Sequence, residues 1–324
     1  MIRINQKFTE QFKLELNKPI ASLTTFGVGG KVAGYKLVAT SAELVEVVTK
    51  AQALRVPFVV IAGGSNVVFP DKPLNKLVIQ IKTNPKAKGA MTRLDGGFVT
   101  VEAGVPLQSL IDFSIKNNLA GLEALSGVPG TVGGAVVGNA GAYGQTISDH
   151  LVSVDIFDGK KVRTITKQAG KFKYRDSVFK HYPQMGKWLV LSVKFKLEKG
   201  DGKTLKQKSR EIIQIRLKKY PPTLKCPGSF FKNVLVKNVS KQALSKIDKS
   251  KIIDGKIPAG YLLETVSAKG MRVGAVAVAD YHGNLIINDG SATFSDVKKL
   301  VAKLKTKVKK HFGIELEEEV RYVV

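Results

Sequence analysis

A glycine-rich stretch near the middle of the chain constrains the fold more than any other feature of the sequence. Residues 126–144 read SGVPGTVGGAVVGNAGAYG and contain seven glycines. Glycine loses more backbone entropy on folding than any other residue, so a purely structural loop gains little from so many of them. Glycines also let the backbone approach a large, flat ligand closely. The stretch therefore predicts a ligand-binding segment, and a cluster of tight surface turns is the alternative.

A second loop of this kind comes earlier in the chain. Gly63, Gly64, Ser65 and Asn66 follow an apolar run at 58–61 that reads as a strand. Consecutive glycines can turn successive N–H groups toward an anion, and the two polar side chains add donors for a phosphate. The loop does not match the G-x-G-x-x-G pattern of dinucleotide-binding folds or the phosphate-binding loop of nucleotide hydrolases. By itself it is also consistent with a plain turn.

The chain is strongly basic, with 52 Lys and Arg, 26 Asp and Glu, and a net charge of +26. Such a charge attracts polyanions, anionic cofactors and acidic lipids. The lysines are spread over the whole chain and lack the interleaved aromatic residues of a single-strand binder, which argues against nucleic acid as a partner. A surface that is lysine-rich throughout is the simpler explanation.

Length and composition indicate a globular protein of two or three domains. The chain has 324 residues, 44% of them apolar, and one cysteine, Cys226. A single cysteine excludes an internal disulfide framework and fits a reducing compartment. The N-terminal residues mix charges with apolar side chains, unlike a signal peptide, and no stretch reads as a membrane helix. We expect a cytoplasmic protein with no metal, no membrane association and no obligate protein partner.

The order of the predicted elements favours an α+β fold, because helices and strands do not alternate regularly. Residues 151–157 and 161–166 flank Asp158-Gly159 and predict a hairpin. Apolar periodicity predicts two helices with Ser41 and Ser295 as their N-caps and a third helix that begins at Pro106.

Changes of pattern along the chain divide it into three regions. The first is a lobe over 1–83, the second a lobe over 84–205 and the third a region over 206–311. Alternating side chains near the C-terminus predict a strand within 312–324, which would place Glu317 and Glu319 on one face.

Three polar groups are candidates for chemistry. Arg175 stands in a lysine-rich region, and its planar guanidinium suits a carboxylate or phosphate, although a surface pair with Asp176 is the simpler alternative. Ser229 follows a glycine, but the G-x-S-x-G elbow of hydrolases is absent, so a loop or cap hydroxyl is the alternative. The acidic run 317–319 would ordinarily be a solvated face.

Several of these motifs together resemble the UDP-N-acetylenolpyruvoylglucosamine reductase (MurB) family. The resemblance rests on GVPGTVGGA at 127–135 and NAGAYG at 139–144, which look like its flavin segment. It extends through TTFGVGG at 24–30, GGSN at 63–66, YRDS at 174–177, GSFFKN at 228–233 and LEEEVR at 316–321, in family order over nearly the whole chain. The spacing between Arg175 and Ser229 resembles the shorter subtype, which lacks a tyrosine loop over the substrate.

The resemblance implies a two-lobed FAD-binding module of the PCMH/VAO type plus an α+β substrate-binding domain. The lobes would be 1–83, with the C-terminal strand 312–324 returning near the active site, and 84–205, and the substrate domain would be 206–311. FAD would be bound non-covalently, with NADPH as co-substrate. The implied cofactor-binding residues are Gly63, Gly64, Ser65, Asn66, Gly127, Pro129, Gly130, Thr131, Gly133, Gly134, Asn139, Ala140, Gly141, Tyr143 and Gly144.

The implied reaction reduces UDP-N-acetylglucosamine enolpyruvate to UDP-N-acetylmuramate, a step of peptidoglycan synthesis on which cell shape and division depend. Hydride passes from flavin N5 to C3 of the substrate, and Ser229 gives a proton to C2. Arg175 and a protonated Glu319 stabilise the charge that develops. The family has proline where this chain has Glu318, which leaves Glu317 as an alternative, although the motif register favours Glu319. Lys232 and Asn233 are candidates to orient Ser229 or to bind the substrate, and Tyr174 and Glu264 are further candidates for contacts to the sugar or diphosphate.

Two other functions are consistent with the sequence. One is an FAD oxidoreductase of the same superfamily that acts on another substrate. The other is a non-enzymatic polyanion-binding protein that has kept a flavin fold. A yellow, flavin-containing protein would favour the enzymes, and a colourless protein with salt-sensitive binding to nucleic acid would favour the last.

Overall fold

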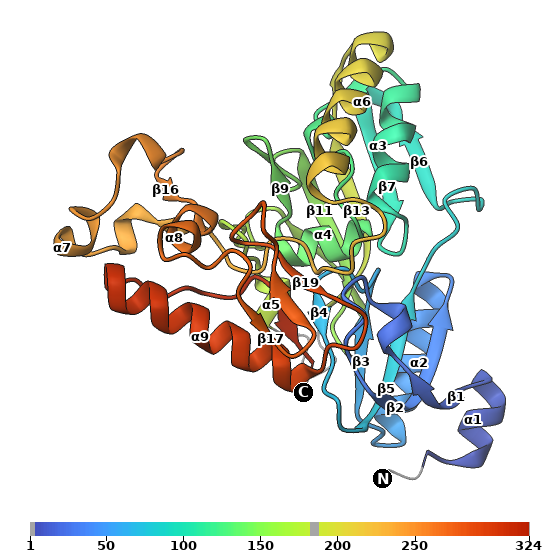
Figure 1. Cartoon of the computed structure of the whole chain (residues 1–324). Coiled ribbons are helices and arrows are strands. Elements are labelled where there is room, and N and C mark those ends of the chain that lie inside the picture. Colours follow the sequence, from blue (N-terminus) through green and yellow to red (C-terminus); the bar gives the residue numbers. More distant parts are fainter. Residues whose placement is uncertain (1–3, 182–187, 324) are drawn as a thin grey trace. The chain divides into compact units, whose positions relative to one another are not determined.

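The computed structural model describes residues 4–181 and 188–323, and the chain forms two compact units. Unit 1 comprises Met1–Lys18, Val32–Gly63 and Asn75–Pro222, and unit 2 comprises Pro19–Lys31, Gly64–Leu74 and Thr223–Val324. The chain therefore passes between the units several times, once between the two glycines of the first loop. Figure 1 follows the chain through both units.

The N-terminal sheet of unit 1 has four strands in the order β1-β2-β5-β3. They are β1 (Glu15–Pro19), β2 (Lys31–Val38), β5 (Leu74–Ile81) and β3 (Phe58–Ile61), and β3 runs parallel to β5. Helices α1 (Gln6–Phe12) and α2 (Ser41–Ala53) share one apolar core with β2 and β5. The helix predicted from Ser41 is confirmed, but its cap is Thr40, whose hydroxyl accepts the Glu43 N–H at 3.1 Å.

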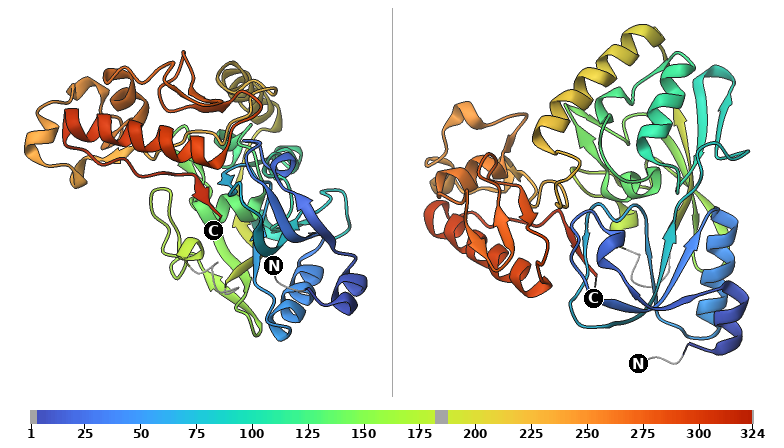
Figure 2. Two further views of the ribbon diagram at one scale, coloured as in Figure 1. Left: turned by 60° about the horizontal axis from the view of Figure 1, so that its bottom comes forward. Right: turned by 45° about the vertical axis from the view of Figure 1, so that its right-hand side comes forward.

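A second, antiparallel sheet of unit 1 has the order β12-β11-β13-β7-β6. Its strands are β12 (Val162–Thr166), β11 (Leu151–Phe157), β13 (Leu189–Lys196), β7 (Phe98–Glu102) and β6 (Met91–Leu94). The predicted hairpin is confirmed, because Phe157 pairs with Val162 on either side of the turn. Helices α3 (Leu107–Lys116) and α4 (Val132–Gly138) contribute to the core of this sheet, and Figure 2 shows α3 beside it.

Helix α6 (Gly202–Lys219) marks a difference from the expected domain boundary. The helix is capped by Asp201, whose carboxylate accepts the Thr204 N–H at 2.9 Å. Its buried Leu205 belongs to the core of the second sheet, and its Ser209 hydroxyl accepts a hydrogen bond from the Ser126 hydroxyl at 2.8 Å. The helix therefore belongs to unit 1, and the division falls at Pro222 rather than at residue 206. Both expected lobes lie in unit 1 for most of their length, each around its own sheet.

Short elements complete unit 1. Strand β8 (Leu119–Ala120) pairs with β14 (Glu198–Lys199), and β9 (Gly141–Ala142) pairs with β10 (Gln145–Thr146). The remaining pieces are η2 (Asp95–Gly97), η3 (Glu123–Leu125) and α5 (Val178–His181).

Unit 2 is built from short strands and one long helix around a single core. Strands β17 (Arg272–Val273), β18 (Val276–Val278) and β19 (Ile286–Asn288) form an antiparallel sheet, and β15 (Val234–Leu235) pairs with β16 (Lys256–Ile257). Helix α8 (Ala259–Thr265) and the long α9 (Phe294–Phe312) pack on this core. The other pieces are η1 (Ala21–Leu23), η5 (Val236–Asn238), α7 (Lys241–Leu244) and η6 (Lys249–Lys251).

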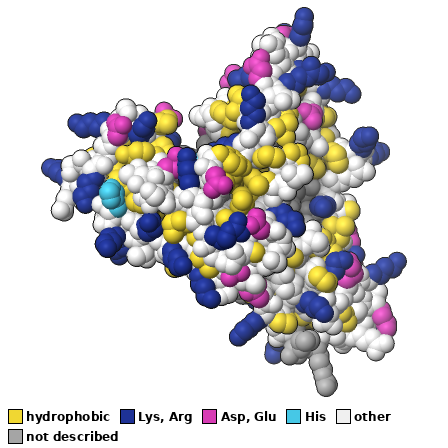
Figure 3. All heavy atoms as spheres, viewed as in Figure 1, with side chains coloured by type: hydrophobic (Ala, Val, Ile, Leu, Met, Phe, Trp, Pro, Cys, Tyr) yellow, Lys and Arg dark blue, Asp and Glu magenta, His cyan; other side chains and the backbone are white. Residues whose placement is uncertain are grey.

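Helix α9 confirms the predicted basic amphipathic helix but begins earlier than expected. Its cap is Thr293 rather than Ser295, because the Thr293 hydroxyl accepts the Asp296 N–H at 3.0 Å and the Asp296 carboxylate accepts the Thr293 N–H at 3.2 Å. Its apolar face is buried in the core of unit 2, whereas most of its lysines are exposed. Lys and Arg side chains are scattered over the face shown in Figure 3 rather than gathered in one patch.

The C-terminal segment is less regular than predicted. Only β20 (Arg321–Tyr322) is a strand, and it runs parallel to β4 (Val67–Val68) within unit 2. Burial alternates from Ile314 to Glu317, and the chain then bends at 319–320. The alternation that would place Glu317 and Glu319 on one face therefore stops short of Glu319. Among the described residues, none of the helices is long and apolar enough to cross a membrane.

Candidate functional site

The predicted site residues divide between the two units. Unit 1 contains Gly63, the glycine-rich segment 127–144, Tyr174 and Arg175. Unit 2 contains the rest, namely Gly64, Ser65, Asn66, Ser229, Lys232, Asn233, Glu264 and Glu319. Each unit thus brings together its own group of predicted residues.

In unit 1 the first glycine loop touches the glycine-rich segment through the backbone. A β-carbon added to Gly63 would lie 2.9 Å from Cα of Gly130, so the approach requires the missing side chain. The preceding residue is held as well, because Gln80 Nε2 donates to the Ala62 carbonyl at 2.8 Å and the Tyr35 hydroxyl donates to Gln80 Oε1 at 2.7 Å. Two segments that are distant in sequence therefore form one rigid backbone surface.

Helix α4 fixes the middle of the glycine-rich segment. Thr131 caps the helix and accepts the Gly134 N–H at 3.3 Å, and the Gly130 carbonyl accepts the Leu107 N–H at 3.0 Å. A β-carbon on Gly133 would lie 2.7 Å from Cβ of Ala103. Gly133 is therefore needed for packing within the protein, whereas a β-carbon on Gly134 would make only an ordinary contact with Ala62 at 3.4 Å.

The end of the segment forms a tight hairpin with buried polar atoms. Tyr143 (φ 49°) and Gly144 (φ 82°) connect β9 and β10 with positive φ at both positions, as a two-residue type I′ turn requires. Asn139 ends α4 at φ 44°, and its Nδ2 donates to the Lys173 carbonyl at 2.8 Å. Two side-chain oxygens here, Oδ1 of Asn139 and Oε1 of Gln145, are buried and accept no hydrogen bond from any residue that the structure describes. Buried acceptors of this kind are normally satisfied by a ligand or water.

Arg175 lies against this hairpin rather than in a surface pair. Its Nη2 donates to the Gly141 carbonyl at 2.8 Å, and its backbone is held at φ 51°. The neighbouring Asp176 accepts from His181 Nε2 at 2.8 Å instead. Ser177 is anchored to α4 through the Val137 carbonyl at 2.7 Å. The alternative of an Arg175–Asp176 ion pair is thus not what the structure shows.

In unit 2, Ser229 lies on a short extended segment between two others. Ser229 bridges Leu285 on one side, and Phe231 bridges Glu318 on the other. The Phe230 N–H donates to the Asn284 carbonyl at 3.0 Å, and the Phe230 carbonyl accepts the Glu319 N–H at 2.8 Å. The residues proposed from the motifs as proton donor and carboxyl group are therefore carried by neighbouring, hydrogen-bonded segments.

Glu317 and Glu319 have different surroundings. The Glu317 side chain is 71% exposed and forms an ion pair with Lys232, whose own side chain is 12% exposed. Glu319 is partly buried, and its carbonyl accepts from Asn66 Nδ2 at 3.2 Å. Asn66, predicted as a donor to a phosphate, thus uses its amide to hold the backbone of Glu319.

Two predicted substrate contacts hold elements of unit 2. Asn233 Oδ1 accepts the Ala259 N–H at 3.1 Å and so satisfies the first turn of α8. Glu264 accepts the Gly283 N–H at 2.9 Å and pairs with Lys269 at 3.1 Å. Partial burial opposes ionisation of Glu264, but the Gly283 hydrogen bond and Lys269 outweigh it and lower the pKa of this carboxyl. Glu264 is therefore an anion at neutral pH.

Two buried polar residues, Glu123 in unit 1 and Asn284 in unit 2, were not found from the sequence. Glu123 is buried beside the glycine-rich segment, where it accepts the Gly121 N–H at 2.8 Å and Lys208 Nζ at 2.9 Å. Burial opposes its ionisation, but these donors prevail and lower the pKa of Glu123. Asn284 is buried between segments of unit 2. A lone acid in an apolar stretch, LEALSG, was the available signal for Glu123, and Asn284 had none.

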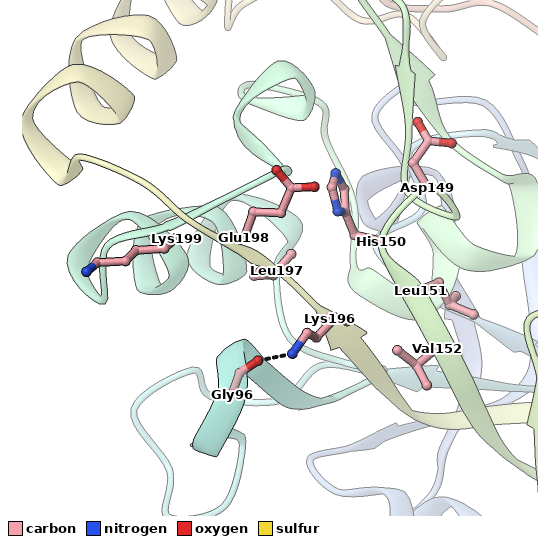
Figure 4. Close-up of a pocket in the computed structure, with 9 residues that line it drawn as sticks. All are labelled: Gly96, Asp149, His150, Leu151, Val152, Lys196, Leu197, Glu198 and Lys199. Atoms are coloured by element: carbon pink, nitrogen blue, oxygen red, sulfur yellow. Dashed lines mark hydrogen bonds between the residues drawn. The ribbon is translucent and has the colours of Figure 1, made fainter.

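A hollow on unit 1 lies apart from the predicted residues. Its volume is about 580 Å³, and Figure 4 shows its lining, which includes Asp149, His150, Lys196 and Glu198. Lys196 Nζ donates to the Gly96 carbonyl across it. No residue predicted from the motifs lines the hollow. Within 4–181 and 188–323, no group of three or more His, Cys, Asp or Glu side chains is placed to hold a metal ion.

The residues of unit 1 fit a bound FAD. Where Gly63 meets Gly130, neither residue has a side chain to cover the backbone, so a flat ligand can approach it closely. The buried oxygens of Asn139 and Gln145 offer acceptors for a ligand. Attachment through the thiol is disfavoured, because Cys226 is buried and burial raises its pKa. The site can therefore hold the cofactor by non-covalent contacts.

Comparisons with known proteins agree with this fit. The model of the FAD binding domain family matches residues 20–164, and that of the UDP-N-acetylenolpyruvoylglucosamine reductase C-terminal domain matches residues 220–323. The UDP-N-acetylenolpyruvoylglucosamine reductases of Solibacter usitatus and Aquifex aeolicus are 38% and 35% identical to the chain. The alignments cover 94% and 95% of this chain and 95% and 94% of those proteins, respectively.

A solved structure is also similar over nearly the whole chain. The crystal structure of the reductase (MurB) from Thermus caldophilus aligns with a TM-score of 0.71 and 29% sequence identity. The alignment covers 96% of this chain and 98% of that one.

Proposed function

Because this chain belongs to the UDP-N-acetylenolpyruvoylglucosamine reductase family, we propose that Arg175, Ser229 and Glu319 carry out its reaction. The chain is a flavin-dependent oxidoreductase of peptidoglycan synthesis, with NADPH as reductant. The substrate is UDP-N-acetylglucosamine enolpyruvate and the product UDP-N-acetylmuramate. The α+β fold expected for such an enzyme is the fold observed.

The cofactor would be held by the glycine loops and their neighbours. The candidates are the residues implied by the motifs, from Gly63 to Asn66 and from Gly127 to Gly144, together with the unexpected Gln145. When bound, FAD supplies the hydride that it receives from NADPH and that is added to C3 of the enolpyruvyl group. The protein's part is to orient the two partners and to manage the charge and the proton of the reaction.

One observation carries the assignment of Ser229 and Glu319 to the same reaction. The 2.8 Å hydrogen bond from the Glu319 N–H to the Phe230 carbonyl joins the segments that bear Ser229 and Glu319. Addition of hydride at C3 leaves negative charge at C2 and in the adjacent carboxylate. The Arg175 guanidinium and the Glu319 carboxyl group would stabilise this charge, and the Ser229 hydroxyl would donate its proton to C2. A carbanion-like acceptor is basic enough to take a proton from a hydroxyl.

Contacts to the rest of the substrate would come from Tyr174, Lys232, Asn233 and Glu264. Lys232 already pairs with Glu317, so a substrate phosphate would compete with a largely exposed carboxylate. Glu264 is an anion and cannot pair with a phosphate directly, which favours a contact to a sugar hydroxyl for this residue.

Further parts of the proposal rest on the sequence. The Arg175–Ser229 spacing supports the shorter subtype without the tyrosine loop. A cytoplasmic location follows from the use of NADPH and a nucleotide sugar. The dispersed lysines argue against a nucleic-acid partner, and the substrate is a small molecule.

The test separates the two half-reactions of the flavin-loaded enzyme. We expect Ser229→Ala to be reduced by NADPH at the normal rate and to be reoxidised by the enolpyruvyl substrate about 100-fold or more slowly, as expected for loss of a general acid. Ser245→Ala, which removes a hydroxyl bonded only to the Gln242 carbonyl at 2.9 Å among the described contacts, is the control. Equal loss of both half-reactions would contradict the role of Ser229. A flavin-loaded wild type that the substrate fails to reoxidise would contradict the function itself.

A further inference from the structure

Asn284 makes an unusual set of contacts with the segment that carries Ser229. Its side-chain Oδ1 accepts the Phe231 N–H at 2.8 Å, and its Nδ2 donates to the Phe231 carbonyl at 2.8 Å. Its own main-chain carbonyl accepts the Phe230 N–H at 3.0 Å. One residue thus supplies partners for three of the four backbone polar groups of Phe230 and Phe231, the two residues that follow Ser229.

These contacts are made in the interior of unit 2. Asn284 is 3% exposed, and Phe230 and Phe231 are 0% and 1% exposed. Bulk water does not reach these groups, so a backbone group that lost its partner would have to move or stay unsatisfied. The position of residues 230–231 therefore depends on the Asn284 side chain, whereas an exposed segment could form hydrogen bonds with water instead.

The segment holding Asn284 is itself fixed on its other side. The Leu285 carbonyl accepts the Ala279 N–H at 2.9 Å, next to β18, and Ser229 bridges Leu285. On the far side of the Ser229 segment, the Phe230 carbonyl accepts the Glu319 N–H at 2.8 Å. A shift of residues 229–231 would therefore move Ser229 and disturb the backbone of Glu319 together.

We propose that Asn284 is a positioning residue that fixes the Ser229 hydroxyl for proton transfer to the substrate. The inference rests on the proposed function of Ser229. Proton transfer requires the donor within hydrogen-bond reach of the acceptor, and a displacement of about 1 Å in such a geometry can slow a reaction about 100-fold. Asn284 acts through the backbone of Phe230 and Phe231 and does not itself take part in the chemistry.

The principal variant is Asn284→Asp, which keeps the acceptor for the Phe231 N–H and places an oxygen against the Phe231 carbonyl. We expect its flavin-loaded form to be reduced by NADPH within about threefold of the normal rate, whereas reoxidation by substrate is about 10- to 100-fold slower. The milder Asn284→Ser retains one hydroxyl donor and serves if the aspartate variant does not fold. We expect an intermediate rate of reoxidation for it.

A control must account for loss of stability alone. Thr293→Ala removes the cap of α9 in the same unit and lies outside the proposed catalytic and binding residues. We expect it to lower the melting temperature while leaving the ratio of the two half-reaction rates unchanged. If Thr293→Ala changes this ratio as much as the Asn284 variants do, the ratio reports stability and the positioning role is refuted.

A double variant tests whether Asn284 acts through Ser229. In a Ser229→Ala background, Asn284→Asp should slow reoxidation by no more than about threefold further, because residues that act as one unit are strongly non-additive. The proposal would be overturned if Asn284→Asp slowed reoxidation in the Ser229→Ala background as much as it does in the wild type. Normal reoxidation of a folded Asn284→Asp would also overturn it.

If the wild type itself fails to react with the substrate, the proposed function falls and the role of Asn284 falls with it. If the wild type reacts and Ser229→Ala does not, only the Asn284 measurements decide this proposal.

Discussion

Asn66 Nδ2 donates a hydrogen bond of 3.2 Å to the carbonyl oxygen of Glu319, 253 positions further along the chain. The Arg321 N–H donates to the Asn66 carbonyl at 3.1 Å, and β20 continues from there beside β4. The Glu319 backbone is thus held by Asn66 through its carbonyl and by Phe230 through its N–H. The C-terminal segment owes its position to these contacts rather than to a long strand.

This arrangement predicts different roles for the two candidate glutamates. We expect Glu319→Ala to slow reoxidation of the reduced enzyme by substrate about 100-fold, as for removal of a group that stabilises developing charge. Glu317→Ala should change the rate by less than about threefold, because Glu317 is largely exposed and surface ion pairs contribute little. Rapid-mixing measurements on both flavin-loaded variants compare them directly. A larger effect of Glu317→Ala than of Glu319→Ala would reverse the assignment.

Arg175 should not tolerate replacement by lysine. Its guanidinium binds the Gly141 carbonyl through Nη2 and is a planar group whose donors match a carboxylate in a fixed geometry, whereas lysine offers a single ammonium group. We expect Arg175→Lys to slow reoxidation by substrate about 100-fold while flavin reduction by NADPH changes much less. The matched control is Arg210→Lys on the exposed side of α6. Comparable slowing of both half-reactions in Arg175→Lys would indicate damage to the flavin segment instead.

The two glycine positions separate packing from cofactor binding. Gly63→Ala forces a β-carbon against Gly130, so we expect a loss of about 1–3 kcal/mol in the free energy of unfolding and weaker FAD binding. Gly134→Ala has room within the protein, so it should bind FAD more weakly without that loss of stability. Chemical denaturation of the FAD-free proteins and FAD titration measure the two effects. Normal FAD affinity in both variants would remove these loops from the proposed cofactor site.

Glu123 should make stability depend on pH. Because its pKa is lowered in the folded protein, its contribution to stability is present above the unfolded pKa of about 4.3 and is lost as the pH falls through the folded value. We expect Glu123→Gln to lower the free energy of unfolding by about 1–3 kcal/mol at pH 7, with the difference shrinking below about pH 4.

Denaturation of the wild type and of Glu123→Gln across this pH range provides the measurement. Glu211→Gln is the control, because Glu211 is exposed on α6 and accepts a hydrogen bond only from Gln207 among the described contacts. A difference between wild type and Glu123→Gln that stays constant from pH 7 to pH 3 would contradict the stabilising role of the Glu123 carboxylate.

Local features of the fold could be predicted from the sequence. The Asp158-Gly159 turn and the alternating residues on both sides specify the β11–β12 hairpin, and the apolar periodicity of α9 specifies its buried face. Helix ends were less certain. Thr40 and Thr293 cap α2 and α9, although Ser41 and Ser295 were expected, because several hydroxyl residues lie near each start and only the folded geometry selects one.

The ordered motifs of the sequence determined the family, and with it the cofactor and the candidates Arg175, Ser229 and Glu319. Only the tertiary structure revealed the close contact of Gly63 with Gly130, the exposure of Glu317, and Asn284 as the support of the Ser229 segment. The physical reason is the range of the interactions. Periodicity, turns and caps depend on neighbouring residues, whereas these contacts join residues tens to hundreds of positions apart, which no local pattern encodes.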